Sequence, residues 1–209
     1  MTEEEAKAWL EERWGREKLE LLDRFVALLR AENSEQNLVS AKSLTEVWAR
    51  HIVDSAQLLE LISRSSRLGW IDIGSGAGLP GLVISVLEPS IEMTLVEPRA
   101  RRVDWLARAN AELGLANCTV EPSKIERLKP FAADVISARA VAPLWQLLLW
   151  GAPFSAPSTR WVLPKGRNAR QEINDLPPNS QPMFHVEQSL TDTDAGIIVG
   201  IGQYKEPLP

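Results

Sequence analysis

The segment from Trp70 to Gly81 constrains the fold of this 209-residue chain more than any other part of it. Residues 70–73 form a short apolar run that predicts a strand, which leads directly into the glycine-rich turn 74–78 and then into a helix. Glycines let the backbone adopt dihedral angles that other residues avoid, and they let a ligand approach the backbone closely. This succession predicts the ligand-binding unit of an α/β sheet, although a glycine-rich turn alone is weak support and also occurs as a plain tight turn.

The chain after Leu68 continues to alternate short apolar runs with helical stretches. We expect strands at residues 70–73, 93–96, 118–120, 134–138 and 161–163, and helices at residues 79–87, 101–113 and 143–149. The last two apolar runs, 184–188 and 196–204, have no clear helix between them and are typical of an antiparallel strand pair. The pattern predicts an α/β fold with a doubly wound, mostly parallel sheet that ends in an antiparallel pair.

Residues 1–66 have a different pattern, which is helical throughout. We expect helices at residues 3–12, 17–30 and 44–62, the last of them capped by Ser43 or Thr45. An apolar stripe recurs at helical spacing in the second of these helices, at Leu19, Leu22, Phe25, Val26 and Leu29. We therefore divide the chain into an N-terminal helical extension, 1–66, that packs on a core domain, 67–209.

Composition narrows the class of protein. The net charge of −5 argues against a protein that coats nucleic acid non-specifically, although it leaves room for a local basic patch. A single cysteine, Cys118, excludes a disulfide framework and a multi-thiolate zinc site. No apolar run approaches the length of a membrane span and no signal peptide is evident, so we expect a cytoplasmic protein. Three of the eight tryptophans fall in helical apolar patterns that predict core positions: Trp105, Trp145 and Trp150.

Two acidic residues indicate which ligand the glycine turn binds. Glu97 ends the second strand, where a carboxylate can accept hydrogen bonds from both hydroxyls of a ribose. Asp72 precedes the glycines, where it would repel a pyrophosphate and favour a cationic ligand such as S-adenosylmethionine, although it can also serve only to cap the turn. A nicotinamide oxidoreductase is disfavoured because the chain has no Tyr-x-x-x-Lys pair and only one tyrosine, Tyr204.

Six short motifs then occur in a fixed order. They are Asn37-Leu38-Val39-Ser40, Arg50-His51-Ile52-Val53-Asp54-Ser55, the glycine turn with Leu79-Pro80-Gly81, Arg101-Arg102-Val103, Ser137-Ala138-Arg139-Ala140 and Pro164-Lys165-Gly166. In this order they resemble the bacterial ribosomal RNA small subunit methyltransferase G family, also known as glucose-inhibited division protein B. The resemblance extends from about Asn37 to near the end of the chain. It departs from the family at residues 193–196, where other members often keep basic residues and this chain reads Thr-Asp-Ala-Gly.

The resemblance implies a class I, Rossmann-like methyltransferase fold and transfer of a methyl group from S-adenosylmethionine to N7 of a guanine in the decoding-region loop of 16S ribosomal RNA. Guanine N7 carries an in-plane lone pair, so the reaction needs no general base and we assign no catalytic residue. The implied partner is 16S rRNA or the small ribosomal subunit, with no DNA or membrane partner, and the implied state is a monomer. We expect no metal, because His51 and His185 are widely separated and lack a carboxylate cluster at ligand spacing.

The resemblance also assigns residues to the site. The predicted cofactor residues are Gly74, Gly76, Leu79, Glu97, Ile125, Glu126 and Arg139. The predicted RNA residues are Arg50, His51, Arg139 and Lys165, with Arg167 and Arg170 as further candidates.

Simpler structural interpretations stand beside these assignments. Ser123 and Glu126 can form a helix capping box, and His51 on a helix is more often a packing or hydrogen-bonding histidine than an acid or base. Arg139 beside a strand end can form a plain surface ion pair. A solvated helix face is the simpler interpretation of a run of four arginines, Arg99, Arg101, Arg102 and Arg108.

Two other classes of function remain in view. A small-molecule methyltransferase on the same fold would have the same cofactor half, and the acidic net charge would suit it. A binding module that had lost activity would need a broken glycine loop, and this loop is intact.

Overall fold

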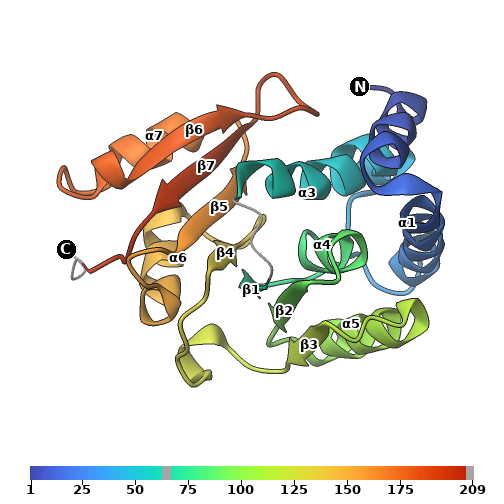
Figure 1. The fold of residues 1–209 in the computed structure, drawn as a ribbon, viewed down its shortest axis with the longest axis horizontal. Coiled ribbons are helices and arrows are strands. Elements are labelled where there is room, and N and C mark those ends of the chain that lie inside the picture. Colours follow the sequence, from blue (N-terminus) through green and yellow to red (C-terminus); the bar gives the residue numbers. More distant parts are fainter. Residues whose placement is uncertain (63–66, 206–209) are drawn as a thin grey trace.

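The computed structural model describes residues 1–62 and 67–205, and its centre is one mixed sheet (Figure 1). Its strands are β1 (Leu68–Ile73), β2 (Ile91–Val96), β3 (Cys118–Glu121), β4 (Val135–Ser137), β5 (Arg160–Lys165), β6 (Phe184–Gln188) and β7 (Gly196–Ile201). The strand order is β3-β2-β1-β4-β5-β7-β6. Strands β1 to β5 are parallel, and β7 is antiparallel to both of its neighbours. The predicted doubly wound sheet with its antiparallel C-terminal pair is therefore confirmed.

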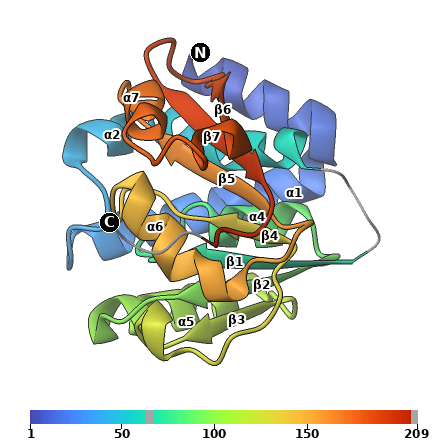
Figure 2. The same cartoon turned by 90° about the vertical axis from the view of Figure 1, so that its left-hand side faces the viewer.

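Helices cover both faces of this sheet (Figure 2). The main ones after β1 are α4 (Gly81–Leu87), α5 (Ala100–Leu113), α6 (Leu144–Gly151) and α7 (Ala169–Asn174). Because successive side chains of a strand point to opposite faces, Trp70 of β1 packs in one apolar core while Ile71 and Ile73 pack in the other. The first core contains α4 and α5, and the second contains α6 and α7. Because both faces of the sheet are buried, the direction of each side chain along a strand is fixed up to the strand's end.

The N-terminal helix α1 (Glu3–Asn33) packs on α4 and α5. It joins the two helices predicted at 3–12 and 17–30 across a kink at Gly15, whose φ is 79° and ψ is 171°. The predicted apolar stripe is buried, and Phe25 stacks on Trp105 with ring centroids 6.4 Å apart. The predicted boundary at residue 66 falls at 63–66, which lie outside the described residues, so the division into two units stays a prediction.

The prediction of one helix at 44–62 is right in part, because the chain is helical at 41–45 and again at 48–61, with a break at Glu46 and changes of helix type. The chain forms α2 (Ala41–Thr45), a π-helical segment η1 (Trp48–Val53), α3 (Asp54–Ala56) and a 3-10 segment η2 (Gln57–Leu61). The cap of α2 is Ser40, which accepts a hydrogen bond from the Ser43 amide, and not Ser43 or Thr45. A tertiary contact explains the break, because the Glu3 carboxylate accepts from the amides of Trp48 and Ala49 at 3.1 and 2.9 Å.

Other local predictions also need correction. Helix α7 was not predicted, since its six residues are too few to show a periodic apolar pattern. Trp105 is buried as expected, whereas Trp145 is 49% exposed and Trp150 is only half-buried. Helix α6 keeps Leu144, Leu147 and Leu148 on its buried face, and this turns the Trp145 side chain outward. Among residues 1–62 and 67–205, no helix is both long and apolar enough to cross a membrane.

Candidate functional site

The carboxyl ends of the parallel strands meet at one edge of the sheet, where ligands bind in folds of this kind. A cavity of about 410 Å³ lies there over the glycine turn, and we call it the glycine-loop pocket. Its lining includes Leu38, Gly74, Gly76, Leu79, Glu97 and Arg102. The amides of Gly74 and Ser75 both donate to the carbonyl of Val96, which turns the chain sharply after β1. Gly74 has a φ of 72°, and a Cβ there would lie 2.7 Å from Val141, so only glycine fits.

The Glu97 carboxylate is fixed at the inner wall of this pocket. It is 2% exposed, its Oε2 accepts from the Gly76 amide at 3.0 Å, and its Oε1 accepts from the Arg99 amide at 2.9 Å. A carboxylate oxygen has two lone pairs, so each oxygen keeps one acceptor site beyond these bonds. The geometry leaves Glu97 able to bind a pair of hydroxyl groups.

The Asp72 carboxylate does not line the glycine-loop pocket. It is fully buried and lines none of the cavities described here. Oδ1 accepts from the Ser137 hydroxyl at 2.7 Å, while Oδ2 has no hydrogen-bond partner among the described residues. Burial raises the pKa of Asp72 to about 6, and the hydrogen bond from Ser137 opposes that rise. Any effect of its charge on a cationic ligand therefore acts through the loop, without direct contact.

An apolar slot of about 240 Å³ adjoins the glycine-loop pocket. Its lining includes Ile73, Val96, Ile125, Glu126, Val141 and Trp150. Ile125 and Glu126 belong to the 3-10 segment η3 (Ile125–Arg127), which follows Lys124 without a side-chain cap. The predicted capping box is thus wrong, because the Ser123 hydroxyl bonds the Lys124 carbonyl instead. The slot has the shape and polarity that suit a flat aromatic ring.

A larger cavity of about 720 Å³, the arginine pocket, lies on the other side of Arg139. Its lining includes Arg50, His51, Asp54, Arg139, Lys165 and Asp192. The loop residues Arg139, Ala140 and Val141 after β4 line this cavity and the glycine-loop pocket alike. The two cavities are therefore neighbours on either side of this loop.

Arg139 and His51 hold each other in place within the arginine pocket. The Arg139 guanidinium forms an ion pair with Asp54 at 3.1 Å and donates a hydrogen bond to Nδ1 of His51. The other ring nitrogen, Nε2, bonds the Ser43 hydroxyl at 2.9 Å. Burial, aided by the charges of Arg139 and Arg50, lowers the pKa of His51 to about 3. His51 is thus a neutral hydrogen-bonding histidine, as the simpler interpretation expected, and its RNA contact stays a prediction.

Lys165 also lines the arginine pocket, and its charge is already paired. Its ammonium donates to the Ala142 carbonyl and to the Glu172 carboxylate, both at 2.8 Å. Glu172 also accepts from the Leu144 amide at 2.6 Å. These bonds join β5, α7 and the start of α6. Lys165 is positioned at the cavity, and its predicted contact with RNA stays a prediction.

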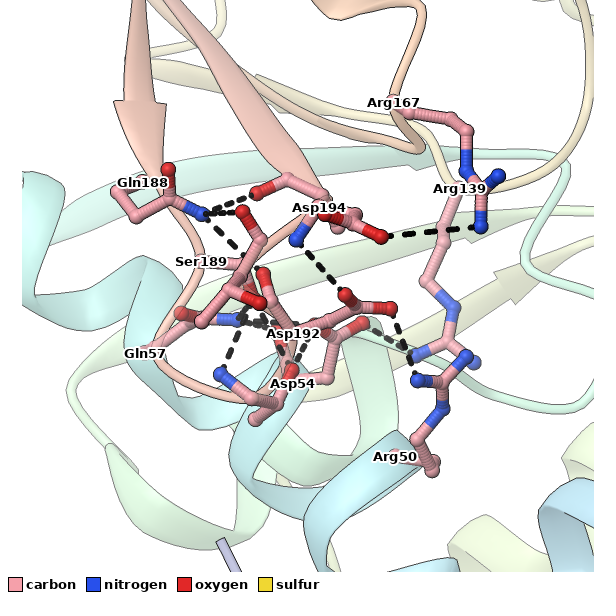
Figure 3. A network of polar contacts seen from close by, with 12 residues as sticks. Arg50, Asp54, Gln57, Arg139, Arg167, Gln188, Ser189, Asp192 and Asp194 are labelled. Atoms are coloured by element: carbon pink, nitrogen blue, oxygen red, sulfur yellow. Dashed lines mark hydrogen bonds and ion pairs between the residues drawn. The ribbon is translucent and has the colours of Figure 1, made fainter.

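Residues 189–195 between β6 and β7 form an acidic loop that contributes Ser189, Thr191 and Asp192 to the lining of the arginine pocket. Figure 3 shows its carboxylates directed toward Arg50 and Arg167. Asp192 pairs with Arg50 at 2.9 Å, and Asp194 pairs with Arg167 at 3.9 Å. The Asp194 amide and the nearby Arg50 guanidinium lower the pKa of Asp192. The Thr191 hydroxyl also donates to Asp54, the partner of Arg139. Asp194, which lies within the departure from the family pattern at 193–196, and Asp192 just before it thus place carboxylates beside two of the predicted RNA-binding arginines.

Several residues that line the glycine-loop pocket were not predicted from the sequence. Leu38, Arg99, Arg102, Val141 and Trp150 all contribute. The interpretation of the arginine run as a solvated face holds for Arg101, which bonds the Glu35 carbonyl, and for Arg108, which pairs with Glu32. It is wrong for Arg102. The position of the Arg-Arg-Val motif just after Glu97, in the first turn of α5, was the signal that could have found Arg102.

The structure shows no cluster of three or more His, Cys, Asp or Glu side chains suited to a metal within residues 1–62 and 67–205. The expectation that no metal is required stays a prediction.

Solved structures identify the class to which this fold belongs. A ribosomal protein L11 methylase from Lactobacillus delbrueckii subsp. bulgaricus is 10% identical, with a TM-score of 0.57 over 73% of this chain and 77% of that chain. A precorrin-6y C5,15-methyltransferase from Geobacter metallireducens is 12% identical, with a TM-score of 0.53 over 81% and 92% of the two chains. With the strand order and the glycine loop, these likenesses define a class I, Rossmann-like methyltransferase fold.

Sequence relatives narrow the class to one family. A sequence model described as rRNA small subunit methyltransferase G matches residues 18–195. A ribosomal RNA small subunit methyltransferase G from Erythrobacter litoralis is 50% identical over 204 residues, which is 98% of each chain. One from Novosphingobium aromaticivorans is 49% identical over 100% of this chain and 93% of its own. The chain belongs to the rRNA small subunit methyltransferase G family, as its motifs predicted.

Proposed function

We propose that this protein transfers a methyl group from S-adenosylmethionine to N7 of a guanine in the 16S rRNA of the small ribosomal subunit. The observation that carries the proposal is the shared wall at residues 139–141, where the glycine-loop pocket meets the arginine pocket. A donor held in the first pocket and a base held in the second would both lie against this loop, and methyl transfer would take place beside it. The names of the family and of its relatives support rRNA as the substrate.

The glycine-loop pocket fits the proposed donor. Glu97 offers two free acceptor sites for the ribose hydroxyls, and the absence of side chains at Gly74 and Gly76 leaves room beside the loop. The apolar slot at Ile125 and Trp150 suits the adenine ring. S-adenosylmethionine supplies an electrophilic methyl group on a sulfonium.

The reaction requires little from the protein beyond alignment of guanine N7 with the methyl group. The lone pair of guanine N7 lies in the ring plane and attacks without loss of a proton, so no general base is required. His51 remains neutral and keeps both nitrogens in hydrogen bonds, which suits a positioning role better than proton transfer. The role of the protein is then to hold the nucleophile in line with the methyl group and to exclude water, an effect that contributes several kcal/mol.

The arginine pocket supplies recognition of the base and of the RNA backbone. Guanine O6 is an acceptor next to N7, and Arg139 lies at the wall next to the donor, where it can donate to O6 while the N7 lone pair stays free to attack the methyl group. Arg50, Arg167 and Arg170 add positive charge for phosphates. Because the whole chain carries −5, we propose that the assembled subunit presents the RNA loop to this small basic surface. The protein would act as a monomer in the cytoplasm, without a metal ion.

Incubation with methyl-labelled S-adenosylmethionine and small subunits from a strain that lacks this gene tests the proposal. We expect label in 16S rRNA, with more label on assembled subunits than on protein-free rRNA. Equal labelling of the two would refute presentation by the subunit. If calorimetry shows that the donor binds but RNA takes up no label, the small-molecule methyltransferase on the same fold becomes the better account.

A further inference from the structure

Arg102 is a cation in the glycine-loop pocket that the proposed function has not used. It stands in the first turn of α5 and lines the pocket together with Gly76 and Glu97. A Cβ built on Gly76 would lie 3.1 Å from Nη1 of Arg102, so the guanidinium lies directly against the glycine loop. The side chain is half-buried there.

No ion pair or hydrogen bond engages the Arg102 guanidinium within residues 1–62 and 67–205. Its neighbours on α5 differ in this respect, since Arg101 bonds the Glu35 carbonyl and Arg108 pairs with Glu32. Glu97 lies in the same pocket, but neither of its oxygens bonds Arg102; they accept from the amides of Gly76 and Arg99. A half-buried guanidinium without a partner is costly unless an anion arrives to meet it.

The other arginine in the wall is already neutralised. Arg139 is paired with Asp54 and bonded to His51 on the side of the arginine pocket. Arg99 also lines the glycine-loop pocket, but its side chain is exposed to solvent. The start of α5 adds the positive end of a helix dipole on the side of Arg102. The glycine-loop pocket therefore favours one negative group near Gly76.

We propose that Arg102 binds the α-carboxylate of the methionine part of S-adenosylmethionine. This inference rests on the proposed function, because it takes that molecule as the ligand. The donor carries a single carboxylate, and with Glu97 on the ribose, Arg102 is the half-buried cation left to receive it. Guanidinium and carboxylate match in shape, since two parallel N–H groups can meet the two oxygens. Arg102 would thus orient the end of the donor that does not react.

Calorimetry on the full chain with two ligands tests this assignment. S-adenosylmethionine and its decarboxylated form differ only in the carboxylate, so their comparison isolates its contribution. We expect Arg102→Gln to weaken binding of S-adenosylmethionine by about tenfold and to change binding of the decarboxylated form by less than about twofold. Arg102→Lys keeps the charge but loses the planar fork, and should fall between Arg102→Gln and the wild type.

Arg101→Gln is the matched control, because it makes the same change one residue away at a side chain that faces Glu35. It should leave both affinities unchanged, and thermal melting of each variant checks that it folds. Equal weakening of both ligands by Arg102→Gln would overturn the assignment, as would a loss of RNA affinity with donor binding intact. A wild-type protein that binds S-adenosylmethionine yet labels no RNA would contradict the proposed substrate and leave this assignment standing.

Discussion

At the scale of single residues, the two buried acids near the glycine loop differ in their partners. Glu97 has a backbone amide on each oxygen, whereas one oxygen of Asp72 has no partner among the described residues. The amides that hold Glu97 come from the glycine loop and from the start of the segment that leads into α5. Glu97 thus both holds the loop and lines the pocket, whereas the Asp72 carboxylate is buried and bonds Ser137 of β4.

Replacing Glu97 should weaken binding of the methyl donor, whereas replacing Lys165 should not. We expect Glu97→Ala to lower affinity for S-adenosylmethionine by roughly 10- to 100-fold, because both ribose contacts and the anchor of the Gly76 amide are lost. Lys165→Ala should leave that affinity unchanged, since Lys165 bonds Ala142 and Glu172 in the other cavity. Calorimetry on the two variants measures both values. Matching losses would show that the two pockets are wrongly assigned.

The buried His51 should make stability depend on pH. Its folded pKa is about 3 and its ordinary value is 6.5, so the unfolded chain binds more protons between these limits. Stability is therefore lost as the pH falls through that window, at a cost of about 2 kcal/mol from pH 7 to pH 5. In His51→Gln, the fall in the free energy of unfolding over that interval should be smaller by this amount. Urea denaturation at both pH values measures it, and equal falls in the two proteins would contradict the account.

Asp72 changes the stability of the protein with pH in the direction opposite to His51. Its folded pKa of about 6 exceeds the ordinary 3.8, so the folded protein takes up a proton first as the pH falls from 6. This uptake stabilises the folded state on acidification, by about 1 kcal/mol from pH 7 to pH 5. Removing the carboxylate in Asp72→Asn should therefore make the acid loss of stability steeper than in the wild type. The opposite signs distinguish the two groups.

Residue roles were predictable where a residue's position relative to a strand end fixes the direction of its side chain. Glu97 follows a strand and Arg139 follows another, so both had to emerge at the ligand-binding edge. Helical spacing alone did not single out Arg102, because it shows which residues share a face and not what that face meets. Only the position of the Arg-Arg-Val motif soon after Glu97 points to Arg102. The hydrogen-bond partners of His51 could not be predicted either, since Ser43 lies on another helical segment and Arg139 lies 88 residues away in the chain.

At the scale of elements, the kink in α1 depends on one backbone conformation. Gly15 has φ 79° and ψ 171°, and a Cβ there would meet nothing within 4 Å. We expect Gly15→Ala to destabilise the protein by about 1–3 kcal/mol, through backbone strain alone. Gly166→Ala is the control, because that glycine also has open space but no positive φ. Chemical denaturation that found the two variants equally stable would refute strain as the cause.

The acidic loop should weaken RNA binding by occupying Arg50 and Arg167. We expect Asp192→Asn with Asp194→Asn to tighten binding to a 16S rRNA fragment and to steepen the salt dependence by about 0.7 per freed cation. The control is Asp23→Asn, which breaks an ion pair with Lys7 on α1. Titrations at several salt concentrations measure the slope. An unchanged slope in the double variant would show that these arginines do not contact RNA.

Elements were predictable where local pattern and tertiary structure agree. The strands β2 and β6 and the helix α5 appear within two residues of the expected limits, because each has its own periodic apolar pattern. The break and the changes of helix type in segment 41–61 could not be predicted, because they depend on the Glu3 carboxylate of another helix. That carboxylate accepts hydrogen bonds from the amides of Trp48 and Ala49. A bond of that kind leaves no trace in local spacing.

At the scale of the whole molecule, the alternation of strands and helices predicted the sheet and its two cores. The position of the pockets followed from the sheet, since parallel strands all end at one edge. The charge distribution could not be predicted from the pattern of strands and helices. The pairing of Asp192 and Asp194 with arginines requires β7 to return beside β5. The net charge of −5 thus coexists with a small basic surface that carboxylates of the same chain partly cover.

Mapping the modified base tests most directly whether this chain methylates N7 of one guanine in 16S rRNA. N7-methylguanine is reduced by borohydride, and aniline then cleaves the RNA at that position. Small subunits from a strain that lacks the gene would be treated with S-adenosylmethionine and either the wild-type protein or Glu97→Ala. We predict one new cleavage site, at a guanine, with the wild-type protein and little or none with the variant. Cleavage at many sites, or methyl transfer without any aniline-sensitive guanine, would contradict the account.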